Sequence, residues 1–171
     1  MITKQISILV LSFFAILCTL NSCTKKPAVG IDLQLYLMAK DTVGFVWFRH
    51  SDSLLHKSEG STHSQPLIRT RFNAIAASKL DSNGMIIPGS VFPDGSLIVK
   101  EMFDKTRTLK TYTTLYKDPS NEIADNKGWL WGAVGVDGTV EITAYRKGSA
   151  CIDCHLQPDN IDYMLMNKFY P

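Results

Sequence analysis

Several features that would mark a special class of protein are missing from this sequence of 171 residues. Its 18 Lys and Arg against 16 Asp and Glu give a net charge of only +2, and no basic cluster is longer than a pair such as Lys25-Lys26. The electrostatic footprint of a nucleic-acid-binding protein is therefore absent. Seven prolines and eleven glycines are close to average usage, which excludes collagen-like and low-complexity chains. With 45% hydrophobic residues, the length fits one globular domain.

The N-terminus has the pattern of an export signal. A short positive region precedes an apolar run over residues 6–20, which is short for a membrane-spanning helix. The run ends in Leu20-Asn21-Ser22-Cys23, which resembles the lipobox at which bacterial lipoproteins are cleaved and lipidated. We expect residues 1–22 to be a lipoprotein signal peptide, Cys23 to carry the lipid, and residues 23–30 to form a tether. A plain signal anchor and a secreted protein without lipid are the alternatives.

Cysteine is scarce, and only one pair remains for the mature domain. Cys18 lies in the expected signal and Cys23 at its end, which leaves Cys151 and Cys154. These two belong to Cys-Ile-Asp-Cys-His, ending at His155, and C-x-x-C-H is the attachment pattern of c-type haem. Two thiols at this spacing can add to the two vinyl groups of a porphyrin, and the adjacent imidazole can then bind the iron. The sequence predicts one covalent haem c, with His155 as the iron ligand.

Three other interpretations of this pair are open. A disulfide between two such close thiols would be strained and redox-active. A thioredoxin-like site needs its C-x-x-C early in a βαβ unit, whereas Cys154 lies 17 residues from the C-terminus. A zinc site needs a fourth ligand beyond Cys151, Cys154 and His155, and the sequence has no second Cys/His cluster.

The remaining chain predicts the α+β class, mainly antiparallel β, in a single domain over residues 31–171. β-branched and aromatic residues mark the strands, and Asp137-Gly138 is a two-residue hairpin signal. The expected strands are 43–50, 66–72, 96–103, 109–117, 129–136 and 139–145. The expected helices are 31–40, 74–80 and 160–169.

Lys100 is out of place in its strand. With a period of two, it lies on one face with Ile98 and Met102, while Glu101 lies on the other. A lysine between apolar neighbours either reaches solvent at a strand edge or is buried, which is rare for lysine. The pattern leaves both open.

The segment from Pro93-Asp94-Gly95 to Glu101, followed by an aromatic hairpin and a terminal C-x-x-C-H, resembles the cytochrome P-460 family. The resemblance covers roughly residues 43–155. It implies a mainly antiparallel, often dimeric domain with haem c and a lysine cross-linked to the porphyrin, and Lys100 stands at that position. It also implies oxidation of hydroxylamine to nitric or nitrous oxide. A related branch, cytochrome c-prime-beta, binds nitric oxide without this turnover.

The resemblance further implies a carboxylate that accepts protons from the substrate. Glu122 or Asp125, in the loop 118–127, is expected in this role rather than Glu101. Met164 and Met166 fit packing roles better than ligand roles, so one axial position of the iron is expected to be open.

Other aromatic and histidine side chains receive simpler interpretations. Trp129 and Trp131 are expected to pack in the core or at the haem edge. The aromatic candidates for lining the distal pocket are Phe45, Trp47 and Phe103. The histidines expected at the surface rather than at the iron are His50, His56 and His63.

Together these patterns predict a periplasmic, membrane-anchored haem c protein with an open axial site, which oxidises hydroxylamine or handles nitric oxide. Its expected partners are a small nitrogen-oxide ligand, a soluble redox partner, the membrane through its lipid and a second copy of the chain in a homodimer. A non-catalytic protein that binds nitric oxide and a plain electron carrier are the alternatives, so enzymatic activity stays open.

Overall fold

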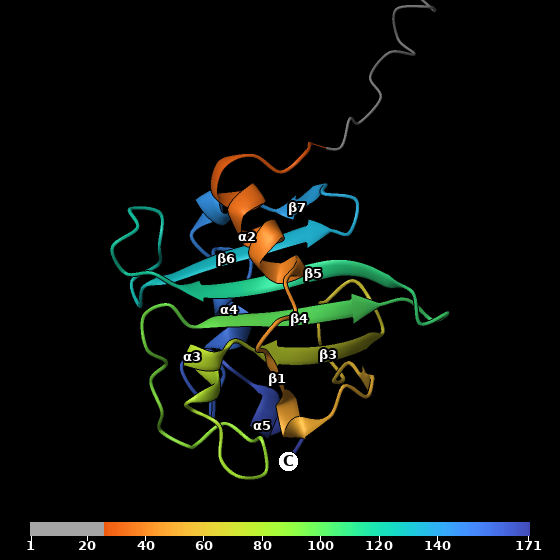
Figure 1. Ribbon diagram of the computed structural model, residues 1–171, viewed down its shortest axis with the longest axis vertical. Coiled ribbons are helices and arrows are strands. Elements are labelled where there is room, and N and C mark those ends of the chain that lie inside the picture. The colour runs from red at the N-terminus through yellow and green to blue at the C-terminus, as the bar shows by residue number, and fades with distance from the viewer. Residues whose placement is uncertain (1–25) are drawn as a thin grey trace, which may run out of the picture.

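The computed structural model describes residues 26–171, and the expected signal peptide with Cys23 lies outside the described residues. In the described part, seven strands form one antiparallel sheet in the order β1-β3-β4-β5-β6-β7, with β2 also paired to β3 (Figure 1). The strands are β1 Val46–Trp47, β2 Leu55–His56, β3 Leu67–Phe72, β4 Leu97–Phe103, β5 Leu109–Lys117, β6 Trp129–Gly135 and β7 Val140–Ile142. The α-helices are α2 Gly30–Lys40, α3 Ala74–Ala77, α4 Ile152–His155 and α5 Met166–Phe169. The expected class, mainly antiparallel β with a few short helices, is confirmed.

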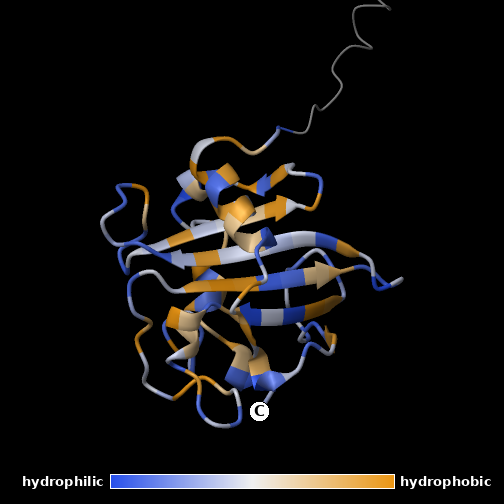
Figure 2. Cartoon of the chain, in the orientation of Figure 1, coloured by the Kyte–Doolittle hydropathy of each residue, from blue (hydrophilic) through white to orange (hydrophobic). Residues whose placement is uncertain are grey.

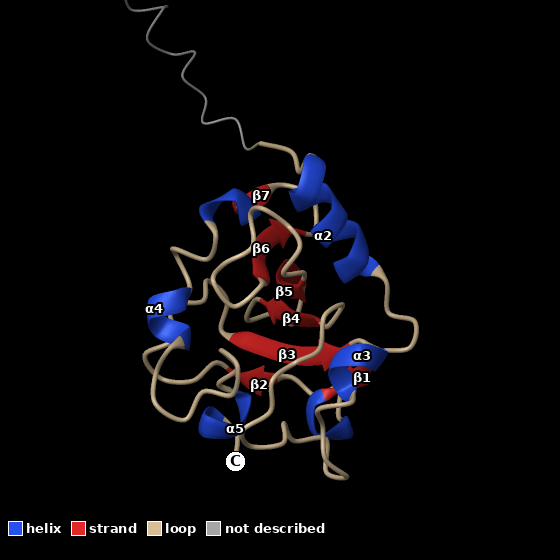
Figure 3. Ribbon diagram, turned by 90° about the vertical axis from the view of Figure 1, so that its left-hand side faces the viewer, coloured by secondary structure: helices blue, strands red, loops and turns tan. Residues whose placement is uncertain are grey.

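The two faces of the sheet are covered by different parts of the chain. Figure 3 shows α2 on one side and α4 on the other. Leu35 of α2 packs against Leu130 of β6, and Ala39 packs against Leu97 of β4. A methyl group at Gly132 would lie only 3.1 Å from the Leu35 side chain, so the glycine allows this close approach. The opposite face is left for the C-terminal segment.

Strand β6, between β5 and β7, is buried along its whole length. It contains no charged residue, and Figure 2 accordingly shows no strongly hydrophilic position along it. A strand covered on both faces requires such a composition. Because side chains alternate along a strand, Leu130 packs on the α2 side of the sheet and its neighbour Trp131 packs in the core on the opposite side. Strand β6 therefore contributes to the core on both faces of the sheet.

The strand expected over residues 43–50 is confirmed only at β1, which pairs with β3. Residues 43–45 are not in a strand, and a 3-10 turn, Phe48–His50, follows β1. Arg49 and His50 have φ of 55° and 53°, in the left-handed region. The Arg49 N–H donates to the carbonyl of Gly84 at 2.9 Å. A partner far along the chain therefore bends this segment, which local β propensity does not reveal.

The C-terminal helix expected over residues 160–169 is also too long. Only α5 is helical, because Asp162 and Tyr163 have φ of 47° and 72° and an isolated bridge joins Ile161 to Met164. The helix expected over 74–80 shortens to α3, with Asn73 as its cap, accepting from the Ala76 N–H at 2.9 Å. The strand expected over 139–145 is likewise only β7.

The first described residues already belong to the domain. Pro27 forms a bridge with Thr139, and the N–H of Ala28 donates to the Gly138 carbonyl at 2.8 Å. The segment expected as a tether is therefore hydrogen-bonded to the Asp137-Gly138 hairpin from Lys26 onward. Across residues 26–171, no helix has the length and hydrophobicity to span a bilayer.

Candidate functional site

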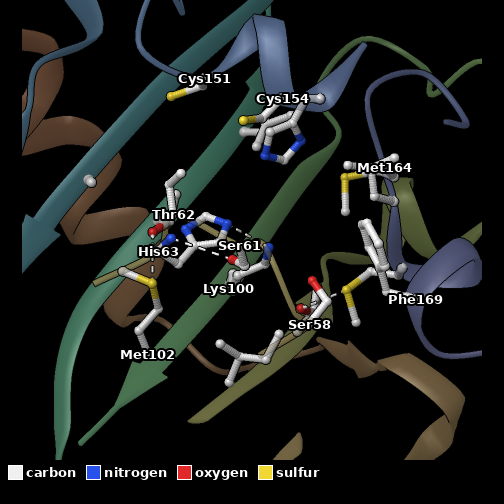
Figure 4. A pocket seen from close by; sticks show the side chains of 18 of the residues that line it. Ser58, Ser61, Thr62, His63, Lys100, Met102, Cys151, Cys154, Met164 and Phe169 are labelled. Atoms are coloured by element: carbon white, nitrogen blue, oxygen red, sulfur yellow. Dashed lines mark hydrogen bonds between the residues drawn. The ribbon is translucent and has the colours of Figure 1, made fainter. Parts of the chain in front are cut away.

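A cavity of about 460 Å³ lies on the sheet face opposite α2, within the size range of cofactor and ligand pockets. Its floor comes from β3, β4, β5 and β6, and its walls come from the loop 58–64, α4, and the chain around α5 (Figure 4). The apolar side chains that line it are Ile68, Ile98, Met102, Leu115, Trp131, Ala133, Ile142, Met164, Leu165, Met166 and Phe169. The floor is thus mainly apolar, as is typical of ligand pockets.

The C-x-x-C-H residues all face this cavity. Cys151, Cys154 and His155 line it, and both thiols are free (Figure 4). The short helix α4 holds them, and it begins after a turn at Gly148, whose carbonyl accepts from the Cys151 N–H at 2.8 Å. At Gly148, which has φ of 74°, an added methyl group would lie 2.7 Å from the Trp131 ring. Glycine therefore lets this turn lie directly against the cavity wall.

The His155 imidazole has a fixed orientation. Its Nδ1 lies 2.7 Å from the Tyr163 carbonyl oxygen, and because a carbonyl only accepts, Nδ1 carries the proton. The lone pair is then on Nε2, the arrangement typical of a metal-binding histidine. Burial, and less strongly the charge of Lys100, lowers the pKa of His155 to about 4, so the ring stays neutral near pH 7. Trp131 packs edge-on at 5.2 Å between ring centres.

The backbone that orients His155 is anchored in the core. Tyr163 has its N–H bonded to the Asn160 side chain at 3.0 Å. Its neighbour Asp162 accepts from the buried Lys117 ammonium at 3.3 Å and from the Trp129 indole at 3.2 Å. These bonds hold the Tyr163 carbonyl in place, so the orientation of the imidazole is set before any ligand arrives.

Lys100 enters the cavity instead of pointing to solvent. It lies on the cavity face of β4, and its Nζ is 3.1 Å from Nε2 of His63 (Figure 4). Burial lowers the pKa of Lys100 to about 8, although the Cys151 thiol acts in the opposite direction. An appreciable fraction of the amine is therefore uncharged just above neutral pH.

The expectation that His63 lies at the surface is wrong. The loop between β2 and β3 folds back and places its ring in the cavity, 6.3 Å from the His155 ring between centres. The charge of Lys100, burial and the nearby His155 lower the pKa of His63 to about 3. The polar run Ser61-Thr62-His63-Ser64 has no periodicity from which this position could be predicted, whereas His56 is exposed as expected.

The expected proton-accepting carboxylates do not lie in the cavity. Glu122 is exposed, and only its backbone carbonyl has a partner, the Lys147 ammonium. Asp125 caps its own loop and accepts from the Trp131 indole at 2.8 Å, so it supports the wall without facing the cavity. Glu101 lies on the opposite face of β4, as alternation predicts. Two carboxylates that the sequence analysis missed line the rim: Glu59 and Glu141.

The aromatic residues expected in the distal pocket are also elsewhere. The guanidinium of Arg69 lies 4.5 Å from the Trp47 ring centre and 5.1 Å from that of Phe103. The Arg71 guanidinium lies 4.5 Å from the ring centre of Phe45. These rings belong to the Glu101 side of the sheet, because both arginines pair with that carboxylate. Met164 and Met166 are buried packing residues that line the cavity.

The cavity therefore brings together Lys100, His63 and the three C-x-x-C-H residues, although they come from β4, one loop and α4. A comparison of the chain with models of known protein families finds no match, and neither does a comparison with curated protein sequences.

Proposed function

We propose that this protein is an exported haem c protein, with thioether bonds from Cys151 and Cys154 and with His155 as an axial ligand of the iron. The observation that carries the proposal is that all three side chains face one apolar cavity while a hydrogen bond directs the free Nε2 of His155 away from Tyr163. Free thiols, an oriented neutral imidazole and a mainly apolar floor are features that a covalent haem site needs.

The chain's own residues would control the site in three ways. The Tyr163 carbonyl fixes the tautomer of His155, and the Trp131 edge limits its rotation. The apolar floor excludes water. Lys100 places one amine inside the cavity, 3.1 Å from the His63 Nε2. When bound, a haem supplies an iron centre that takes up small ligands and exchanges electrons.

We further propose that the ligands are small nitrogen oxides, as the resemblance to the cytochrome P-460 family implies. The cavity position of Lys100 supports its assignment as the residue cross-linked to the porphyrin. Glu101, Glu122 and Asp125 are absent from the cavity lining, but Glu59 and Glu141 belong to it, so the second candidate, binding of nitric oxide without hydroxylamine oxidation, stands beside the first.

The decisive experiment is expression of the full chain with export in cells competent in cytochrome c maturation. We expect a protein whose mass includes one haem and whose haem stain survives a denaturing gel. Addition of nitric oxide and of hydroxylamine then separates the two candidates, because only the enzyme oxidises hydroxylamine with an electron acceptor present. A colourless protein without haem mass would overturn the proposal.

The cross-link is tested by Lys100→Ala. After proteolysis of the wild type, we expect the porphyrin to carry two peptides, one with the C-x-x-C-H residues and one with Lys100; the variant should carry only the first. The ferrous Soret band of the wild type should also be strongly red-shifted, and this shift should disappear in Lys100→Ala. The exposed Lys105→Ala is the matched control. A wild-type digest with a single porphyrin-bound peptide would contradict the assignment of Lys100.

We also propose that lipid on Cys23 holds the protein to a membrane in the periplasm. Cys23→Ala should move most of the protein from the membrane to the soluble fraction, because no acyl chain remains to insert. Cys18→Ala, within the expected signal, is the control that should stay with the membrane. Fractionation followed by a haem stain measures both, and unchanged partitioning of Cys23→Ala would exclude lipidation.

A further inference from the structure

We propose that His63 is a second, exchangeable axial ligand of the iron bound by His155, so that a small ligand binds by displacing the His63 imidazole. This inference rests on the proposed haem site and changes its resting state from an open to an internally occupied coordination position.

The separation of the two imidazoles carries the argument. The ring centres of His63 and His155 lie 6.3 Å apart, and the ring planes are inclined by 84° (Figure 4). Two imidazoles bound to one metal ion by bonds of about 2 Å have their ring centres roughly 6 Å apart. The distance between these two ring centres therefore matches that of two imidazoles on opposite sides of one metal ion.

The ligating atom of His63 also faces inward. Its Nε2 lies 3.1 Å from the Lys100 Nζ inside the cavity. The charged form of Lys100 only donates, so with it the Nε2 atom accepts and carries the lone pair, and this hydrogen bond has to break before Nε2 binds a metal ion. Neutral imidazole is the commonest protein ligand of metal ions, which favours His63 over the amine of Lys100 for this position.

The loop that carries His63 lies outside the strand pairing of the sheet. Its ends are fixed by the pairing of His56 with Leu67 and by the bond from the Lys57 N–H to the Pro66 carbonyl at 2.9 Å. Between these ends, the Lys57 ammonium donates to the His63 carbonyl at 2.7 Å. The exposed positions of the loop are Glu59, Gly60, Thr62 and Ser64.

A surface segment with few buried contacts opens at low free-energy cost. Departure of His63 therefore requires only a local movement of residues 58–64, whereas His155 is held by the anchored segment around Tyr163. The two histidines therefore differ in their proposed roles. His155 is the permanent ligand, whereas a small molecule that binds the iron more tightly displaces His63.

The test compares absorption and electron paramagnetic resonance spectra of the exported holoprotein and its variants. We expect a six-coordinate, low-spin wild type, a five-coordinate, high-spin His63→Ala variant, and an unchanged spectrum for the exposed His56→Ala control. Imidazole added to His63→Ala should restore the low-spin spectrum, a rescue that a merely structural role would not give. Nitric oxide should bind the variant about tenfold faster or more, because no bound side chain has to leave first.

Two results would overturn the inference: a five-coordinate wild type, or a His63→Ala variant that stays six-coordinate until Lys100 is also replaced. Failure of the proposed function is distinct, because it appears earlier, as a protein without covalent haem. Matching circular dichroism spectra of His63→Ala and the wild type establish that the variant is folded.

Discussion

Replacing both Cys151 and Cys154 by alanine is expected to abolish covalent haem attachment in the exported protein. In the proposed site each thiol would form one thioether bond to the porphyrin, so the double variant would have no covalent link at the motif. The remaining bond from His155 is a coordinate bond that breaks when the protein is denatured. The haem stain on a denaturing gel should fall from full intensity to background, and the measured mass should contain no haem.

The cysteines of the chain provide the controls for this experiment. Cys151→Ala and Cys154→Ala as single variants each retain one thioether bond, so both should keep some stain while the double variant keeps none. Cys23→Ala should keep full stain, because its thiol is outside the described domain and is assigned to the lipid. Haem that survives denaturation in the double variant would disprove attachment at these residues, unless a digest finds it bound to Lys100.

The sequence was most informative where a pattern has only one structural solution. Alternation along residues 96–103 correctly separated Lys100 from Glu101 onto opposite faces. The Asp137-Gly138 signal correctly placed the hairpin, in which Gly138 has φ of 82°. The C-x-x-C-H spacing brought three side chains to one cavity, because a short helix keeps them close together whatever the rest of the chain does.

The errors arose where distant parts of the chain decide a local conformation. The bend at Arg49 depends on the Gly84 carbonyl, and the left-handed Tyr163 belongs to the segment that orients His155. Neither partner is visible in a local window. The position of Asp125 was wrong for a similar reason, since its oxygens cap its own loop and accept from Trp131. Periodicity shows which residues share a face, but not which loop covers that face.

His63 is the clearest case. Its polar neighbours resemble those of the exposed His56, and only the path of the loop across the sheet brings it to Lys100. The cavity consequently contains a second imidazole where a carboxylate was expected. This difference changes the chemistry that the site supports, because an imidazole can occupy the iron itself, whereas a distal carboxylate would act on the substrate.

The two faces of β4 carry different charged residues, Lys100 on the cavity side and Glu101 on the side of α2. The second large expected effect concerns Glu101. Glu101 is expected to be essential for folding rather than for chemistry. Its carboxylate accepts from Arg69 at 2.6 Å and from the fully buried Arg71 at 3.0 Å. The Arg71 guanidinium further donates to the carbonyls of Ala39 and Asp41, which joins the end of α2 to the sheet. The pair is therefore part of the connection between helix and sheet.

Glu101→Ala should lower the free energy of unfolding by about 3–5 kcal/mol, because it leaves the buried Arg71 charge without a counterion. Glu101→Gln should have a smaller effect, since its amide oxygen still accepts one hydrogen bond. The control is Asp52→Ala, which removes only the pair with Arg69 at 3.9 Å, where the Asp52 side chain is 72% exposed, and should change stability by no more than about 1 kcal/mol. Urea unfolding of the holoproteins measures all three.

The same variants decide whether Glu101 acts on a ligand. Since the sheet backbone separates this carboxylate from the cavity, folded Glu101→Gln protein should keep the wild-type haem spectrum and the wild-type rate of nitric oxide binding, even though it unfolds at lower urea. A loss of stability below about 1 kcal/mol in Glu101→Ala would contradict the buried ion pair. An altered ligand-binding rate in Glu101→Gln would instead place the carboxylate on the functional face. The stability of the fold and the rate of ligand binding can therefore change independently, because Lys100 and Glu101 lie on opposite sides of the sheet.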